Sequence, residues 1–204
     1  MIRRRCATAA ILAVPLAIAA ARPEFTSTWL APDAAGVSFA GKKVAALVMS
    51  SDQSLRVSGE EQLVRELAAR GVHGVATYRM APSEELTSAD RARPWFERAA
   101  VEGVVALRPV SADKQVIYSP SVWTTTSYTT LWGYYGYGWS GVYSPGSSRT
   151  DRIVVVETLV YSVALDKLLW AGASTTTNPA DLQTFVKDLV SEAVKEMKKQ
   201  RLVR

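Results

Sequence analysis

The sequence predicts an α/β protein built on a single mixed sheet: a βαβαβ start, then a long antiparallel hairpin, then a C-terminal amphipathic helix packed on the sheet. Three observations predict this architecture. Continuous apolar runs at 44–49 and 103–107 are typical of strands buried on both faces. A β-rich run at 151–165 meets another at 168–176 across a tight turn, which is a hairpin pattern. Apolar residues from Leu182 to Met197 recur at three- and four-residue steps, which is a helical pattern.

Residues 1–21 have the features of a secretory signal peptide, with three arginines, a short apolar run and cleavage expected after Ala19 or Ala21. The apolar run is shorter than the roughly 20 residues that a spanning helix needs, and Pro15 interrupts it. Both observations favour a cleaved signal peptide over the alternative, an uncleaved N-terminal anchor. The only cysteine, Cys6, lies here, so the mature chain has no thiol for a disulfide, a nucleophile or a metal ligand. We therefore expect an exported, periplasmic protein without a cofactor and without a spanning segment in the mature chain.

The charge of the chain is mostly carried by this leader. Without its three arginines the formal charge falls from +5 to +2, which removes the main support for nucleic acid as a partner. Residues 22–42 contain scattered prolines, glycines and aromatics and predict an extended N-terminal arm that lays Trp29 and Phe39 on the body. Residues 43–204 then form one α/β domain, a length that can bury a substantial core.

Local signals place the helices and the shorter strand. A capping-box pattern at 58–61 predicts the start of the first helix, and Gly71 its end. A short strand is expected at 75–78. Pro94 predicts a broken helix before the third strand, because proline removes a helical hydrogen bond. Asn178 as N-cap and Pro179 at the first helical position predict the start of the last helix.

One long segment is unlike the rest of the chain. From Gln115 to Ser148 there is no charged side chain, yet six of the eight tyrosines and three of the six tryptophans lie there. We interpret 119–150 as an aromatic Gly/Tyr-rich excursion between the parallel half of the sheet and the hairpin. Its rings either contact a partner or pack onto the protein's own sheet. Tyr and Trp suit interfaces because they combine apolar area with a polar tip. The candidate partner-binding residues are Trp132, Tyr134, Tyr135, Tyr137, Trp139 and Tyr143.

No catalytic motif stands out. Residues 136–141 spell the dinucleotide pattern G-x-G-x-x-G, but no buried strand precedes it and no helix start follows, so we reject it. His73, the single histidine, has no serine motif or metal partner around it. Glu60 is interpreted as a helix-start acid, and Glu157 as solvent-facing on the polar side of its strand, with burial inside the β-rich run as the alternative. Asp52 follows the first apolar strand, where open parallel sheets bind ligands, and a polar turn is the alternative.

With these segments in view, the sequence resembles a group of bacterial envelope proteins, many of them lipoproteins, that has no established activity. The likeness spans nearly the whole mature chain. Members often begin with a lipobox cysteine, which this chain lacks, so the resemblance does not imply an anchor here. More loosely, the fold is similar to envelope accessory domains such as the N-terminal domain of the Tol translocation protein, the curli secretion lipoprotein and the activators of penicillin-binding proteins. The matching segments are 25–29, 31–33, 41–45, 132–135, 142–146, 157–161 and 166–172.

Two functional hypotheses follow. The first is a non-enzymatic periplasmic binding or accessory module that contacts an envelope protein or a glycan surface through the aromatic segment. The second is a hydrolase acting on peptidoglycan or another glycan, with a site beyond the first strand near Asp52. Single-stranded nucleic acid is not expected as a partner, because its stacking platforms carry neighbouring Arg or Lys.

Overall fold

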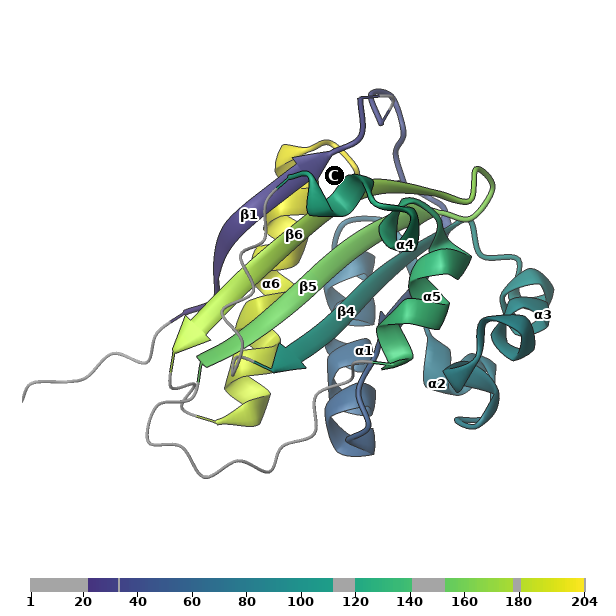
Figure 1. Cartoon of the computed structure of the whole chain (residues 1–204), viewed down its shortest axis with the longest axis horizontal. Helices are drawn as coiled ribbons and strands as arrows, with labels where there is room; N and C mark the ends of the chain where they lie inside the picture. Colours follow the sequence, from purple (N-terminus) through teal and green to yellow (C-terminus); the bar gives the residue numbers. More distant parts are fainter. Residues whose placement is uncertain (1–21, 33, 112–119, 141–152, 178–180, 204) are drawn as a thin grey trace, which may run out of the picture.

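The computed structural model describes residues 22–32, 34–111, 120–140, 153–177 and 181–203 of the chain. In these residues six strands form one mixed sheet in the order β1-β6-β5-β4-β2-β3, with helices on both faces (Figure 1). The predicted fold class is confirmed. The strands are β1 (Glu24–Leu30), β2 (Lys43–Val48), β3 (His73–Ala76), β4 (Gly103–Ser111), β5 (Ile153–Ser162) and β6 (Lys167–Thr177). The α-helices are α1 (Gln53–Ala68), α2 (Thr77–Met80), α3 (Ala89–Ala99), α4 (Thr126–Thr129), α5 (Leu131–Ser140) and α6 (Leu182–Lys199), and η1 (Glu85–Thr87) and η2 (Val122–Thr124) are short 3-10 helices.

The parallel half of the sheet consists of β2, β3 and β4. β2 pairs in parallel with β3 on one side and with β4 on the other, which confirms the βαβαβ start. Every residue of β2 from Val44 to Val48 is buried, because helices cover both faces of the sheet at this point. β3 begins at His73, slightly earlier than predicted, and ends at Ala76, where α2 begins.

The antiparallel half completes the sheet. β4 pairs with β5 and β5 pairs with β6, which confirms the predicted hairpin. The turn between β5 and β6 ends at Asp166, whose φ of 42° lies in the left-handed region. Residues 22–42, predicted as an extended arm, contain the edge strand β1, which pairs antiparallel with β6. Phe39 is buried and Trp29 is half-buried against the core.

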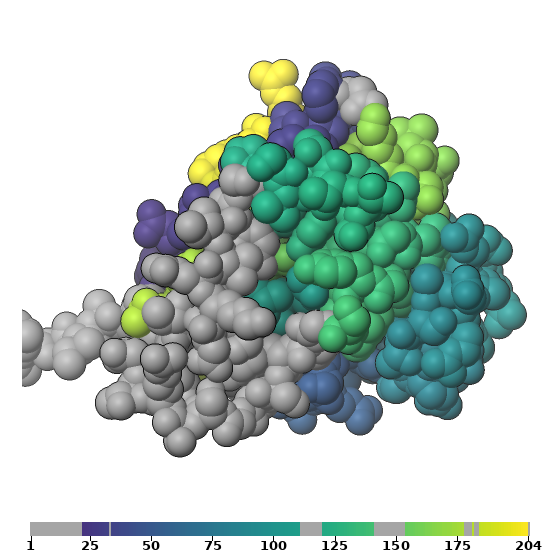
Figure 2. All heavy atoms as spheres, viewed as in Figure 1, coloured from purple at the N-terminus to yellow at the C-terminus, as the bar shows by residue number. Residues whose placement is uncertain are grey.

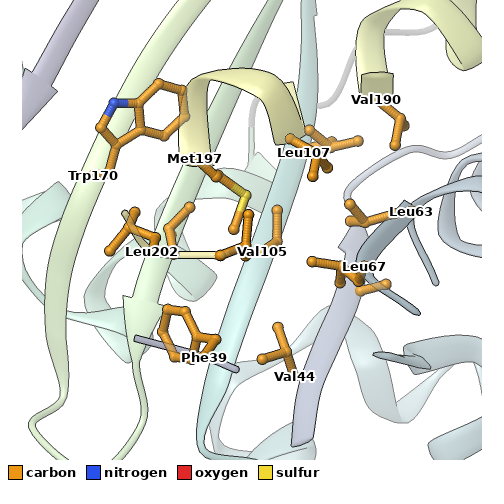
Figure 3. Packing of buried hydrophobic residues seen from close by; sticks show 14 of the residues in the cluster. Phe39, Val44, Leu63, Leu67, Val105, Leu107, Trp170, Val190, Met197 and Leu202 are labelled. Atoms are coloured by element: carbon orange, nitrogen blue, oxygen red, sulfur yellow. The ribbon is translucent and has the colours of Figure 1, made fainter. Parts of the chain in front are cut away.

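Apolar cores lie on both faces of the sheet. On one face, Leu63 and Leu67 of α1 and Val190 and Met197 of α6 converge on Val105 of β4 (Figure 3). α6 therefore packs on the sheet, as its apolar stripe predicts. On the opposite face, α3 and α5 cover the sheet, and their rings form the second core with residues of β2, β4, β5 and β6.

Two helix starts differ from the sequence prediction for the same reason. The side chain of Asp52 accepts a hydrogen bond from the Leu55 amide at 3.0 Å, so α1 begins at Gln53 and the predicted capping box at Ser58 is wrong. Asp181 accepts from the Thr184 amide at 2.8 Å, so α6 begins at Leu182 rather than after Asn178. In both cases an aspartate takes the orphan amide of the third helical residue.

The predicted break at Pro94 is also wrong. α3 runs without interruption from Ala89 to Ala99 with Pro94 inside it. Pro94 is exposed, so water can reach the carbonyl group that loses its helical donor. Asn178 and Pro179 lie outside the described residues.

Candidate functional site

In its described part, residues 120–140, the aromatic segment folds as short helices and not as a loop. Residues 122–140 form η2, α4 and α5, which lie across the face of the sheet opposite α6 (Figure 1; Figure 2 shows the same segment in space-filling view). In α5 the buried positions are Leu131, Tyr134, Tyr135 and Gly138, at spacings of three and four residues. This is the period of a helix with one face on a core. The predicted glycine-rich excursion is therefore, in its described part, a packed helix.

A buried ion pair lies beneath α5. Arg108 of β4 and Glu157 of β5 are direct neighbours in the antiparallel register, and Arg108 Nε donates to Glu157 Oε2 at 2.7 Å. Their exposed fractions are 3% and 0%. The prediction that Glu157 faces solvent is wrong, because β5 lies between β4 and β6 with helices on both faces of the sheet. Burial of both charges requires hydrogen bonds to the remaining oxygens of the carboxylate.

Two tyrosines supply those hydrogen bonds. The Tyr128 hydroxyl donates to Glu157 Oε1 at 2.6 Å, and the Tyr134 hydroxyl donates to Oε2 at 2.9 Å. Tyr161 in turn donates its hydroxyl to the backbone carbonyl of Tyr128 at 2.8 Å. We call Arg108, Tyr128, Tyr134 and Glu157 the Glu157 cluster. It fastens α4 and α5 to the middle of the sheet by side chains from four separate elements.

The surroundings of Tyr128, Tyr134 and Arg108 in the Glu157 cluster shift their pKa values. Burial, followed by the neighbouring carboxylate of Glu157, raises the pKa of Tyr128 and of Tyr134, so both hydroxyls keep their protons and act as donors. Burial opposes the charge of Arg108, but the hydrogen bond to Glu157 and its negative charge raise the pKa of Arg108 above the ordinary value. The guanidinium also lies 4.8 Å from the ring centroid of Tyr137. The cluster is closed and internally satisfied, which suits a structural role.

The predicted partner-binding residues fall into three sets. Tyr134 and Tyr135 are fully buried. Trp132 and Trp139 are half-buried on the same flank of α5, where both rings contact Tyr135, and Tyr137 is 42% exposed. Tyr143 lies outside the described residues. Some rings of α5 therefore lie in the core, and others lie at the surface.

The solvent-facing side of α5 carries no charge. Its exposed positions are Gly133, Gly136, Tyr137 and Ser140, which follow the same three- and four-residue spacing as the buried ones. We call these four residues the outer stripe. An exposed helix face usually carries charged and polar residues. On one flank, the Arg93 guanidinium lies 4.7 Å from the centroid of the Trp132 ring.

A cavity of about 300 Å³ opens beside α5, at the end of β2. We call it the Arg56 cavity. It brings together Trp139 of the aromatic segment and the polar turn after the first parallel strand, two regions that the sequence singled out separately. Asp52 does not line it, since its carboxylate caps α1. The cavity is lined by Ser50, Ser51, Gln53, Arg56, Ser83, Thr87 and Trp139, a set without a carboxylate among the described residues.

Sequence reasoning missed Arg56 and misjudged Glu60. With α1 beginning at Gln53, both lie on its buried side together with Gly59 and Leu63. Glu60 accepts hydrogen bonds from the Val48 amide, the Thr77 hydroxyl and the Tyr78 amide, so it joins β2 to α2 instead of capping a helix. Burial raises the pKa of Glu60, and these hydrogen bonds counteract part of that rise. Asp52 as the N-cap of α1 was the sequence signal that would have placed Arg56 and Glu60 on the buried side of this helix.

His73 lies exposed on the edge strand β3. Within the described ranges, no group of three histidine, cysteine, aspartate or glutamate side chains is placed to hold a metal ion. None of the helices in those ranges combines the length and the apolar character needed to cross a bilayer.

Comparison with solved structures gives distant likenesses of fold. No protein-family model and no curated protein matches the chain. It is similar to the PelC dodecamer from Paraburkholderia phytofirmans at 13% identity, over 78% of this chain and 87% of that chain, with a TM-score of 0.43. It is also similar to lipoprotein GNA1162 from Neisseria meningitidis at 11% identity, over 78% of this chain and 99% of that chain, with a TM-score of 0.40. Likenesses at this level concern the fold alone, and the looser resemblance to Tol and to the activators of penicillin-binding proteins stays a prediction.

Proposed function

We propose that this chain is a non-catalytic accessory module of the bacterial envelope that binds a partner protein through the outer stripe of α5. The observation that carries the proposal is the composition of that stripe. The four exposed positions along one side of α5 hold two glycines, a tyrosine and a serine, whereas a solvated helix face usually holds charged residues. Half-buried Trp132 and Trp139 border the stripe and would form the rim of the contact.

Gly136 is a glycine inside a helix that the packing of the protein does not require. A glycine inside a helix costs roughly 0.5–1 kcal/mol relative to alanine. Gly133 has a local reason to be glycine, because a Cβ there would lie 2.8 Å from the Thr130 hydroxyl oxygen. A Cβ on Gly136 would meet no atom within 4 Å, so nothing inside the protein requires glycine at this position. Close approach of a second protein backbone would account for it.

The buried side of α5 supports the same proposal. Binding surfaces work best on elements whose position is fixed by packing and hydrogen bonds. The Glu157 cluster fastens α5 from below through Tyr134, and the Tyr137 ring lies against the Arg108 guanidinium. The outer stripe is therefore a surface held on a rigid support. The proposal that the module is non-catalytic is supported by the engagement of Glu157 in this cluster and of Asp52 in the cap of α1.

The envelope assignment is supported by the signal-peptide features of residues 1–21 and by the group resemblance of the mature sequence. A protein is preferred over a glycan as the partner because the stripe places glycines at its centre. Glycan platforms depend on exposed ring faces, and only Tyr137 among the described rings of α5 is exposed.

Site-specific photo-crosslinking in the native cell tests the proposal. A photoreactive phenylalanine analogue at Tyr137 should give one dominant crosslinked protein band from the envelope fraction. The matched control carries the same analogue at Lys195, an exposed position of α6 on the opposite face of the sheet. Equal crosslinking from both positions, or none from Tyr137, would refute the outer stripe as the contact surface.

Variants of α5 then separate binding from folding. Gly136→Glu should abolish the crosslinked complex, captured through the analogue at Tyr137, while the melting temperature changes only slightly, because a Cβ there would meet no atom within 4 Å. Tyr135→Ala should instead lower the melting temperature strongly, because Tyr135 is fully buried. A complex that survives Gly136→Glu unchanged would show that the partner binds elsewhere.

A further inference from the structure

Two arginines of the described residues are buried, and their surroundings differ in one respect. Arg108 is 3% exposed and Arg56 is 5% exposed. Arg108 has the carboxylate of Glu157 at 2.7 Å. No carboxylate oxygen of the described residues lies within 4.0 Å of the Arg56 guanidinium. Among the described residues, Arg56 is therefore the buried arginine without a carboxylate in direct contact, and an uncompensated charge in a protein interior costs several kcal/mol.

The nearest acid along α1 does not meet this need. Glu60 lies one helical turn after Arg56, but its two oxygens accept hydrogen bonds from Val48, Thr77 and Tyr78 on the side of β2 and α2. The charges of Glu60 and Arg56 attract each other through space, but the carboxylate does not contact the guanidinium. Asp52 is likewise engaged, as the cap of α1.

Arg56 borders the Arg56 cavity with unused donors. Its Nη2 donates to the Ser83 hydroxyl oxygen at 2.8 Å, and its Nε has no hydrogen-bond partner among the described residues. The Ser83 oxygen thus acts as an acceptor, which leaves its own hydrogen available. The Ser50 hydroxyl oxygen similarly accepts from the Asp52 amide at 3.1 Å, which leaves a second hydrogen. The cavity is rich in donors, borders a cation and has no carboxylate in its described lining.

The place of the cavity in the fold agrees with this chemistry. It lies at the carboxyl end of β2, a central parallel strand, where open α/β sheets bind their ligands. Its volume of about 300 Å³ is at the lower end of the range for small-molecule sites. Trp139 adds an apolar wall, so the cavity can hold a small ligand that has both a charged and an apolar part.

We infer that the Arg56 cavity binds a small ligand through an oxyanion, a phosphate or carboxylate group that Arg56 and the Ser50 and Ser83 hydroxyls hold. The planar guanidinium fits either group, because it can donate two parallel N–H bonds to a pair of oxygens. This site is distinct from the outer stripe, so it goes beyond the proposed partner contact, and either can fail without the other.

Nuclear magnetic resonance on the full mature chain tests the inference directly. The Nε–H resonance of Arg56 is followed while inorganic phosphate, and separately acetate, is added against sodium chloride at equal ionic strength. Saturable movement with phosphate, with acetate or with both supports an oxyanion site and tells the two groups apart. Movement no greater than with chloride overturns the inference. The measurement uses the unaltered protein, so it does not depend on any variant folding.

Variants give an independent readout through thermal stability. A ligand that binds only the folded state raises the melting temperature by mass action. Phosphate or acetate should raise it in the unaltered chain and not in Arg56→Met, while Ser83→Ala should weaken the apparent affinity about tenfold. Without ligand, Arg56→Met should melt at the same or a higher temperature, because it removes an unpaired buried charge. A clear fall in the melting temperature of ligand-free Arg56→Met would show that Arg56 stabilises the fold, and would overturn the inference.

Discussion

Arg108 and Glu157 face each other across neighbouring strands, 49 positions apart in the chain, and join by a hydrogen bond of 2.7 Å with almost no access to solvent. Breaking such a pair from one side leaves the other charge buried alone. We expect Arg108→Met to lower the free energy of unfolding by about 3–5 kcal/mol. Urea denaturation checks this value.

The double variant Arg108→Met, Glu157→Gln is the control for that experiment. It removes both charges and keeps an amide oxygen as acceptor for one of the two tyrosine hydroxyls, so it should recover part of the lost stability. If the losses in unfolding free energy measured for Arg108→Met and for Glu157→Gln alone simply add in the double variant, the two residues do not act as a pair.

The tyrosine hydroxyls of the Glu157 cluster should be worth more than an exposed one. Tyr134→Phe removes a hydrogen bond to a buried carboxylate, and we expect a loss of about 1.5–3 kcal/mol in the free energy of unfolding. Tyr78→Phe is the matched control, because its hydroxyl donates to the partly exposed carboxylate of Glu61 at 2.7 Å, and it should change stability by about 1 kcal/mol or less. Similar losses for the two variants would contradict the assignment of the hydroxyl of Tyr134 to Glu157.

Two glycines of α5 should respond in opposite directions to the same substitution. Gly136→Ala should raise the free energy of unfolding by about 0.5–1 kcal/mol, because a Cβ there meets open space and alanine favours the helix. Gly138→Ala should lower it by about 1–3 kcal/mol, because its Cβ would lie 2.5 Å from the Met49 sulfur. Differential scanning calorimetry of the two variants checks both signs. Destabilisation by Gly136→Ala would mean that this glycine serves the fold, not a partner.

The sheet could be predicted from the sequence because each of its main strands has a local sequence pattern. The run from Val44 to Val48 is apolar at every position, which only a strand buried on both faces requires. The hairpin is marked by two β-rich runs that meet at a short turn. Each of these signals can be detected within about ten residues, without knowledge of the rest of the fold.

The site was harder to predict, for two physical reasons. The helical period of Leu131, Tyr134 and Tyr135 was present, but the glycines between them suggest a loop because glycine is a poor helix former. Packing of the rings on the sheet overrides that preference. The burial of Glu157 could not be inferred from its own strand, since it depends on Arg108, which only the strand register brings opposite.

Asp52 tests the rival hypothesis of a hydrolase. As the N-cap of α1, Asp52→Ala should lower the free energy of unfolding by about 1 kcal/mol, whereas Asp52→Asn should keep most of the stability, because asparagine caps equally well. A catalytic acid would behave differently: Asp52→Asn would abolish turnover of peptidoglycan fragments. Purified protein and both variants should be compared in denaturation and in that activity screen. Turnover that disappears in Asp52→Asn would favour the hydrolase over the binding module.

Glu60 should make stability depend on pH in a direction opposite to that of a salt-bridged acid. Burial raises its pKa in the folded protein above the ordinary value of 4.5. The folded state therefore binds this proton more tightly than the unfolded chain, and the stability that the proton confers is present below about pH 4.5 and lost as the pH rises through the folded pKa. The difference in unfolding free energy between the unaltered chain and Glu60→Gln should then be more favourable to the unaltered chain at about pH 4 than at about pH 7. Urea denaturation at the two pH values measures it, with Glu97→Gln on the exposed face of α3 as control. A difference that grows toward neutral pH would show that the three hydrogen bonds to Glu60 outweigh its burial.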